Sequence, residues 1–246
     1  HWWKLWQETA HVRWDIIVDL RNSLVSRLLR GQKKYIWHGK NNNLHKIEQI
    51  AALIKADTLP APRLWFDADT MRLAEKLAPK GNPVIAIGPA ANWVAKTWPA
   101  ENFIELINRL TAADSLLPGA RIAVFAAPGE EKIAYQVLHA VPEARRIDGI
   151  AWATPLLAAA AIQRCDLYIG NDSGLMHCAA AAGTPTLGLF GPSYPAVYRP
   201  WGTHCAHVST PETFGQLTDY PGYDPKTAPC LMTSLTVDMA ENAVIK

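Results

Sequence analysis

The strongest constraint on the fold is a regular alternation of short apolar runs with amphipathic segments in the second half of the chain. Continuous apolar runs indicate buried strands, and apolar residues at a period of 3.6 indicate helices that cover one face of a sheet. Strands and helices that alternate in this way form a parallel sheet covered on both faces. The expected strands are 84–88, 121–126, a short one from Ile147, 166–170 and 186–190, and the expected helices are 101–111, 130–140, 156–164 and 174–182.

The first part of the chain carries a weaker version of the same pattern. The cluster from Pro79 to Pro83 is typical of a turn or linker. We therefore expect an α/β protein with two Rossmann-like domains and parallel sheets, over 1–80 and 81–246, the first of them incomplete. The chain begins with His1 in a segment of helical character, so we expect further residues upstream of it. The expected elements of the first domain are strands at 14–20 and 35–37 and helices at 23–30, 44–54 and 69–78.

Composition excludes several classes of protein. The chain has 246 residues, of which 49% are hydrophobic and 19% charged, as in a globular protein. A formal net charge of +2 gives no argument for a nucleic-acid partner. The longest apolar candidate, 179–190, is interrupted by Gly183 and Pro185, so no run reaches the roughly 18 residues of a membrane span. The four cysteines show no metal-ligand spacing, which favours reduced thiols, no metal site and a cytoplasmic location.

An unusual cluster of polar residues follows the strand expected at 166–170. Asn171, Asp172, Ser173 and Gly174 come directly after it and lead into a helix. The free N–H groups and the dipole of a helix N-terminus favour an anion such as phosphate. His177 lies on the same face of the first turn as Ser173 and can donate to the same anion. Ser173 alone would be read as an ordinary helix N-cap, and His177 alone as a partly buried histidine.

Other polar residues follow neighbouring strands and belong to the same edge of the predicted sheet, where ligands of such folds bind. Lys96 supplies a positive charge suited to a diphosphate. Glu130 or Glu131 can accept hydrogen bonds from ribose hydroxyls. Together with the cluster after 170, these residues predict a pocket for a nucleoside diphosphate, although Lys96 alone could be a surface charge and the glutamates ordinary residues of a first helical turn.

A serine hydrolase is the alternative that the cluster invites, and the spacing argues against it. Gly170 and Gly174 do not flank Ser173 as they would in G-x-S-x-G. Asp172 has a different expected role. Because a carboxylate beside a diphosphate would be repelled, we expect Asp172 to contact sugar hydroxyls or to accept backbone N–H groups of the turn.

Three stretches of sequence resemble a known family. They are "GPAANWVAKTWPAENF" from Gly88, "APGEE" from Ala127 and "IGNDSGLMHCAAAAGTPTLGLFGPSYP" from Ile169. The region from about Pro83 to Gly202 is similar to the ADP-heptose:lipopolysaccharide heptosyltransferases of glycosyltransferase family nine. Weaker likeness continues in "RWDIIVDLRNSLVSRLL" and "CLMTSLTVDMAENAV".

The resemblance implies a GT-B fold, with a nucleotide-sugar domain at the C-terminus and an acceptor-side domain at the N-terminus. It implies transfer of a heptose or related sugar from an ADP-sugar to a lipopolysaccharide core or another glycan, with inversion and without a metal or cofactor. Lys96 would lie near the donor phosphates, and Glu130 or Glu131 near the adenosine ribose. Asp172, Ser173, Gly174 and His177 would line the diphosphate and sugar.

One part of the family pattern has no counterpart in this sequence. The N-terminal G-D element, whose aspartate is the proposed general base, is expected upstream of His1. The alternative is a non-catalytic nucleotide-binding protein on the same fold. Two roles are open for a group of aromatic and basic residues near the start of the chain: Trp2, Trp3, Trp6, Arg21, Arg27 and Arg30. They could contact the inner membrane or an acidic glycolipid. We expect instead that the tryptophans pack a helix onto the sheet and that the arginines form a solvated face.

Overall fold

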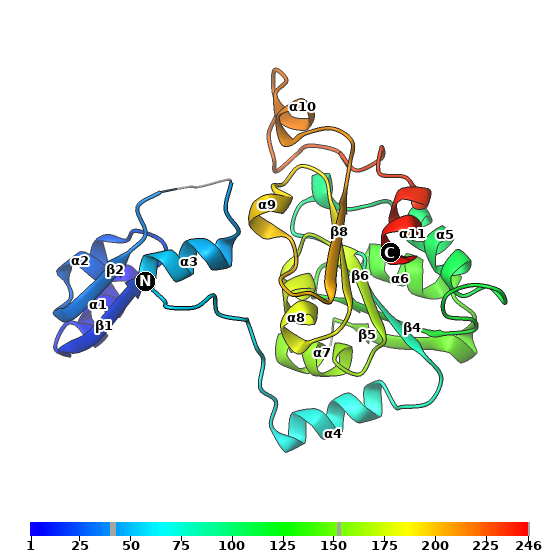
Figure 1. Ribbon diagram of the computed structural model, residues 1–246, viewed down its shortest axis with the longest axis horizontal. Helices are drawn as coiled ribbons and strands as arrows, with labels where there is room; N and C mark the ends of the chain where they lie inside the picture. Colours follow the sequence, from blue (N-terminus) through cyan, green and yellow to red (C-terminus); the bar gives the residue numbers. More distant parts are fainter. Residues whose placement is uncertain (40–42, 152–153, 246) are drawn as a thin grey trace. The chain divides into compact units, whose positions relative to one another are not determined.

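The computed structural model describes residues 1–39, 43–151 and 154–245. The chain divides into two compact units, His1–Pro60 and Ala61–Lys246. In Figure 1 the elements up to α3 form the first unit and those from α4 onward form the second. Lys246, where the predicted second domain ends, lies outside the described residues.

The first unit contains a two-stranded parallel sheet. Trp14 pairs with Gly31, and Asp19 at the carboxyl end of its strand pairs with Ile36. Asp19 accepts hydrogen bonds from the backbone N–H groups of Arg21 and Ser23, which fixes the turn into the next helix. The predicted elements are confirmed with changed ends, the second strand beginning earlier than expected. The elements are α1 Trp2–Thr9, β1 Trp14–Asp19, α2 Leu24–Leu28, β2 Gly31–Ile36 and α3 Lys46–Ile54.

The second unit is built on a six-stranded, fully parallel sheet. Its strand order is β5-β4-β3-β6-β7-β8. Counted from the first strand of this unit, that is the order 3-2-1-4-5-6 of dinucleotide-binding Rossmann sheets, whose ligands bind where the order reverses. The reversal lies between β3 and β6. The strands are β3 Val84–Gly88, β4 Arg121–Ala126, β5 Arg146–Ile150, β6 Leu167–Asn171, β7 Thr186–Phe190 and β8 Cys205–Ser209.

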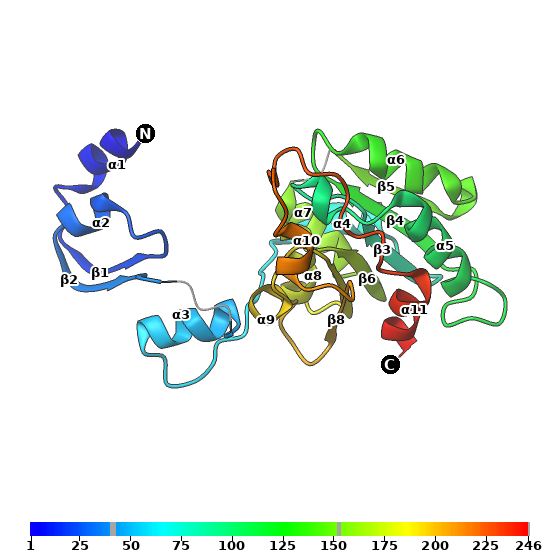
Figure 2. The same ribbon diagram turned by 90° about the horizontal axis from the view of Figure 1, so that it is seen from above.

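Helices cover both faces of this sheet, as the alternation predicted (Figure 2). One layer contains α5, α6 and α11, and the other contains α4, α7 and α8. The helices are α4 Ala68–Leu77, α5 Ala100–Leu110, α6 Glu131–Ala140, α7 Pro155–Ile162, α8 Gly174–Ala182, α9 Pro195–Tyr198, α10 Phe214–Thr218 and α11 Val237–Ile245, with 3-10 turns at Val94–Lys96 and Glu143–Arg145.

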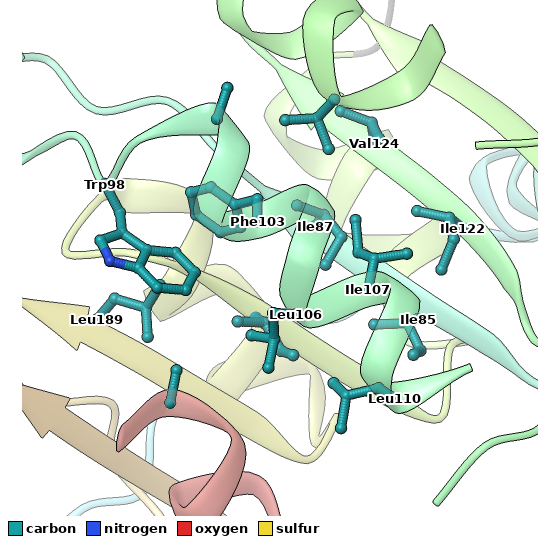
Figure 3. Close-up of a cluster of buried hydrophobic side chains, with 14 of the residues drawn as sticks. Ile85, Ile87, Trp98, Phe103, Leu106, Ile107, Leu110, Ile122, Val124 and Leu189 are labelled. Atoms are coloured by element: carbon teal, nitrogen blue, oxygen red, sulfur yellow. The ribbon is translucent and has the colours of Figure 1, made fainter. Parts of the chain in front are cut away.

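The core beneath α5 contains Trp98 and Phe103, whose rings pack edge to face with their centres 4.9 Å apart (Figure 3). Both side chains are fully buried, together with Ile85 and Ile87 of the central strand. The indole Nε1 of Trp98 donates to the carbonyl of Leu235 at 2.7 Å, so its polar atom is satisfied inside the core. This bond attaches the segment before α11 to the loop that follows β3.

The boundary between the units lies earlier than the position near Gly81 that the linker-like cluster predicted. The units separate after Pro60, and α4 belongs to the second one. Ala74 of α4 is fully buried in one core with Val84 and Ala160. An amphipathic pattern shows that a helix covers a sheet but does not show which sheet, so the sequence placed α4 in the first domain.

The N-terminal helix does not pack as expected. Within the described part of the chain, α1 buries none of its residues, and Trp3 is 67% exposed while stacking on Trp6. The expected packing of these tryptophans onto a sheet is therefore wrong for the described unit.

None of the described helices combines the length and the apolar character needed to cross a membrane. All four cysteines are free thiols; Cys165 is buried and the other three are half-buried.

Candidate functional site

A cavity of about 580 Å³ opens at the edge of the second sheet where β3, β4 and β6 end. It lies at the reversal of strand order, where Gly88 and Gly170 pair across the two central strands. Its size suits a small-molecule ligand. The predicted site residues that line it are Lys96, Glu130, Asp172, Ser173, Gly174 and His177. Glu131 lies outside the described lining.

Lys96 and Asp172 form an ion pair within this lining. The Lys96 ammonium donates to the Asp172 carboxylate Oδ2 and to the Asp172 backbone carbonyl, both at 3.0 Å. The two side chains are only 14% and 9% exposed, and the ammonium also lies 5.3 Å from the centre of the Trp93 ring. The lysine is therefore held in one position with its charge at the cavity.

Asp172 has a partner that the sequence did not suggest. Its carboxylate Oδ2 accepts from the Lys96 side chain, and contact with sugar hydroxyls stays a prediction. An ammonium at hydrogen-bond distance in a nearly buried place is a stronger partner for a carboxylate than a neutral N–H. The pair links residues that are far apart in sequence, and no local pattern reveals it.

Asn171 fixes the loop that carries Lys96. Its side chain is fully buried, its Oδ1 accepts from the backbone N–H of Trp98 at 3.1 Å, and its Nδ2 donates to the carbonyl of Pro89 at 2.7 Å. The backbone N–H of Leu231 holds the same loop from the other side by donating to the carbonyl of Ala95. Sequence reasoning placed Asn171 in the polar cluster but gave it no role.

The first turn of α8 presents its N-terminus to the cavity. Ser173 is the N-cap residue, yet among the described residues its side chain makes no capping hydrogen bond. A Cβ built on Gly174 would meet no described atom within 4 Å, so the space over this glycine is open. His177 lines the cavity one turn further on, as the sequence predicted. The arrangement offers a hydroxyl and backbone N–H groups to an anion.

The two glutamates of the β4–α6 turn have different positions. Glu130 lines the cavity, and its carboxylate accepts from the backbone N–H of Ala127 at 2.9 Å. Glu131 accepts from the backbone N–H of Gly129, and this hydrogen bond lowers the pKa of its carboxyl group. Gly129 has a φ of 96°, a conformation that glycine adopts without strain. Glu131 thus stabilises the turn, and Glu130 is the glutamate of this turn that lines the cavity.

On the side of β4 and β5 the cavity lining is mostly apolar, which the sequence did not indicate. Phe125 and Gly149, at the ends of β4 and β5, line it with Pro128 and Ala158. A Cβ on Gly149 would lie 2.5 Å from the ring of Phe125, so the ring lies directly over this glycine. In a sequence, small and apolar residues at strand ends cannot be distinguished from residues of the hydrophobic core.

The geometry does not resemble a serine-hydrolase triad. The Asp172 carboxylate, which would have to orient an imidazole, is bonded to Lys96. Within the described residues, no group of three or more His, Cys, Asp and Glu side chains is arranged to hold a metal ion.

Comparison with known proteins identifies the family. Residues 45–219 match glycosyltransferase family 9 (heptosyltransferase). Lipooligosaccharide heptosyltransferase 2 of Haemophilus influenzae is 31% identical over 224 residues, which cover 76% of this chain and 63% of the relative. The chain thus spans less than two thirds of this relative's length, and it spans 45% of the heptosyltransferase 2 proteins of Salmonella typhimurium and E. coli.

Two solved structures share the fold. One is E. coli ADP-heptose lps heptosyltransferase II, with a TM-score of 0.74 at 19% identity over 100% of this chain and 80% of that one. The other is the family 9 glycosyl transferase of Veillonella parvula, with a TM-score of 0.74 at 18% identity over 98% and 77% of the two chains. The α/β, GT-B-like fold class predicted from the sequence is confirmed. The chain belongs to glycosyltransferase family 9, the heptosyltransferases.

Proposed function

We propose that this chain transfers a heptose from an ADP-heptose donor to a lipopolysaccharide-core acceptor, and that the cavity of the second unit binds the donor. The names of the related proteins support the sugar, the nucleotide and the acceptor. The cavity supports the donor independently, because one end offers a fixed ammonium and a helix N-terminus while the other is apolar.

Different parts of the donor bind at the two ends of the cavity. Lys96 and the first turn of α8 hold the diphosphate, whose negative charge a cation and free N–H groups stabilise. His177 donates to the same group or to the sugar beside it. Glu130 accepts from the ribose hydroxyls, and the apolar end, with Phe125 under it, takes the base.

The groups that bind the diphosphate also stabilise the transition state in which the bond between the sugar and the diphosphate breaks. The acceptor hydroxyl attacks the anomeric carbon and gives its proton to a general base on the acceptor side. The bond from that carbon to the diphosphate oxygen breaks, and ADP leaves with one more negative charge. Attack from the face opposite the leaving group inverts the anomeric centre. Lys96 and the N–H groups of α8 stabilise the developing charge without a metal, and electrostatic stabilisation of this kind is often the largest catalytic effect. Asp172 keeps the Lys96 ammonium directed at the diphosphate.

The observation that carries the proposal is the Lys96–Asp172 pair beside the N-terminus of α8. The experiment measures binding of ADP by calorimetry, and then transfer from ADP-heptose to heptose-deficient lipopolysaccharide. Binding with transfer supports the enzyme. Binding without transfer supports a nucleotide-binding protein on the same fold.

We also propose that the protein acts at the cytoplasmic face of the membrane and touches it through α1. Trp2 and Trp3 of this helix are 42% and 67% exposed, and tryptophan is enriched at the lipid–water interface. Co-sedimentation with vesicles containing anionic lipid should fall when both are changed to Ser. Trp65→Ser is the matched control, since Trp65 is 81% exposed outside this helix. Equal sedimentation of the parent and the double variant would contradict the contact.

A further inference from the structure

Tyr168 lies on the central strand β6 beneath the cavity. Its side chain is fully buried, and among the described residues its hydroxyl has no hydrogen-bond partner. A buried hydroxyl without a hydrogen-bond partner lowers the stability of the folded protein, so its presence indicates a functional role. The ring of Tyr168 packs in the core with Ala74 and Val84, but its hydroxyl has no part in that packing or in the donor contacts proposed above.

Two glycines make room for this side chain. Tyr168 and Gly170 point to the same face of β6 because side chains alternate along a strand. A Cβ on Gly170, or on Gly88 across the pair, would overlap the Tyr168 hydroxyl oxygen. The ring therefore runs along the strand toward its carboxyl end, and its hydroxyl reaches the level of Gly88, which lines the cavity.

The neighbours of the hydroxyl also belong to the cavity. Burial raises the pKa of Tyr168, hydrogen bonding with the Ser173 side chain acts in the opposite direction, and the nearby Cys178 and Glu130 raise it further. Ser173, Cys178 and Glu130 all line the cavity. The Ser173 interaction is not a fully formed hydrogen bond, since the Tyr168 hydroxyl has none of ordinary length in the described structure.

We propose that Tyr168 is a positioning residue that orients the Ser173 hydroxyl toward the phosphate groups of the donor. When the donor binds, the Tyr168 hydroxyl donates to Ser173 Oγ, and Ser173 donates its own proton to a phosphate oxygen. A serine hydroxyl can accept and donate at once, and its side chain is not occupied by capping among the described residues. Hydrogen bonds in such a chain strengthen one another. The inference rests on the proposed donor site.

The test compares ADP with adenosine, which lacks phosphates. Calorimetry on the full chain should show that Tyr168→Phe weakens ADP binding about threefold to tenfold, the value of one hydrogen bond, and leaves adenosine binding unchanged. In a Ser173→Ala background, Tyr168→Phe should have no further effect on ADP affinity. Without ADP, the melting temperature of Tyr168→Phe should equal or exceed that of the parent, because the Tyr168 hydroxyl has no hydrogen-bond partner among the described residues.

Tyr223→Phe is the matched control, since this hydroxyl is also buried without a partner among the described residues and lies outside the cavity lining. It should bind ADP as the parent does. An unchanged ADP affinity in Tyr168→Phe, an equal loss for adenosine, or a loss that persists with Ser173→Ala would each overturn the inference. If the parent itself does not bind ADP, the proposed donor site is the claim that fails.

Discussion

The side-chain oxygen of Asn171 accepts a hydrogen bond from the backbone N–H of Trp98 at 3.1 Å, across 73 residues of sequence. The same side chain donates to the carbonyl of Pro89, so one amide holds both ends of the loop that carries Lys96. The end of β6 thus positions a residue of the loop after β3. Two strands at the reversal of the sheet order build the site together.

Asn171→Ala should destabilise the protein and weaken ADP binding. The variant leaves the N–H of Trp98 and the carbonyl of Pro89 unpaired in a buried place, at roughly 1 to 3 kcal/mol for each group. Denaturant unfolding measures the loss of stability, and calorimetry measures the affinity. Asn108→Ala, on the exposed face of α5, is the control and should change neither the stability nor the ADP affinity. A stable Asn171→Ala variant would show that the loop is held by other contacts.

Gly149→Ala should reduce nucleotide binding by moving the ring of Phe125. The added Cβ would lie 2.5 Å from that ring, so the ring must shift within the apolar end of the cavity. Overpacking of this kind costs about 1 to 3 kcal/mol of stability. Adenosine and ADP affinities should fall together, because the change affects the base and not the phosphates.

Phe125→Leu in the same chain should restore part of the lost stability by making room for the Cβ. Gly215→Ala serves as the control, since its Cβ would meet no described atom within 4 Å. If Gly149→Ala weakened ADP binding but left adenosine binding intact, the assignment of the base to this end would be wrong.

The first unit should lose stability in acid through Asp19. Burial alone would raise the pKa of this carboxyl group, but hydrogen bonds from the Ser26 hydroxyl, the Arg21 N–H and the side chain and backbone of Ser23 outweigh it and lower the pKa to about 2. A lowered pKa in the folded state gives stability that is complete above the ordinary value of 3.8 and is lost as the pH falls toward 2.

The measurement is the difference in unfolding free energy between the parent and Asp19→Asn at several pH values. The parent should be more stable near neutral pH, and its advantage should shrink between pH 4 and pH 2. An advantage that stayed constant over this range would show that the ionised carboxylate is not what stabilises the turn.

The sequence predicted the central strands of the second unit well because they are buried on both faces. The ranges 84–88, 121–126 and 186–190 match the observed strands, since a short continuous apolar run between turns is typical of a strand in a covered parallel sheet. β8 was missed. It is an edge strand whose residues are half-buried or exposed, among them His207, and it carries no continuous apolar run.

The candidate site was predictable where residues lie at strand ends and have distinctive chemistry. Lys96, Ser173 and His177 were placed on one cavity because parallel strands end at one edge. The Lys96–Asp172 pair and the Asn171 bridge were not predictable. They depend on which strands are neighbours in the sheet, and the order β4-β3-β6-β7 cannot be read from the order along the chain.

The most direct test of the central claim is the affinity of Lys96→Met for ADP, measured by calorimetry beside the parent and Lys132→Met. Lys96 is nearly buried at the cavity, whereas Lys132 lies exposed on α6. A hydrogen bond to a charged group contributes about 1.5 to 3 kcal/mol, so Lys96→Met should bind ADP roughly 10 to 150 times more weakly. Lys132→Met should bind as the parent does. Equal ADP affinity in the parent and Lys96→Met, or no binding of ADP by the parent, would contradict the donor site proposed for this cavity.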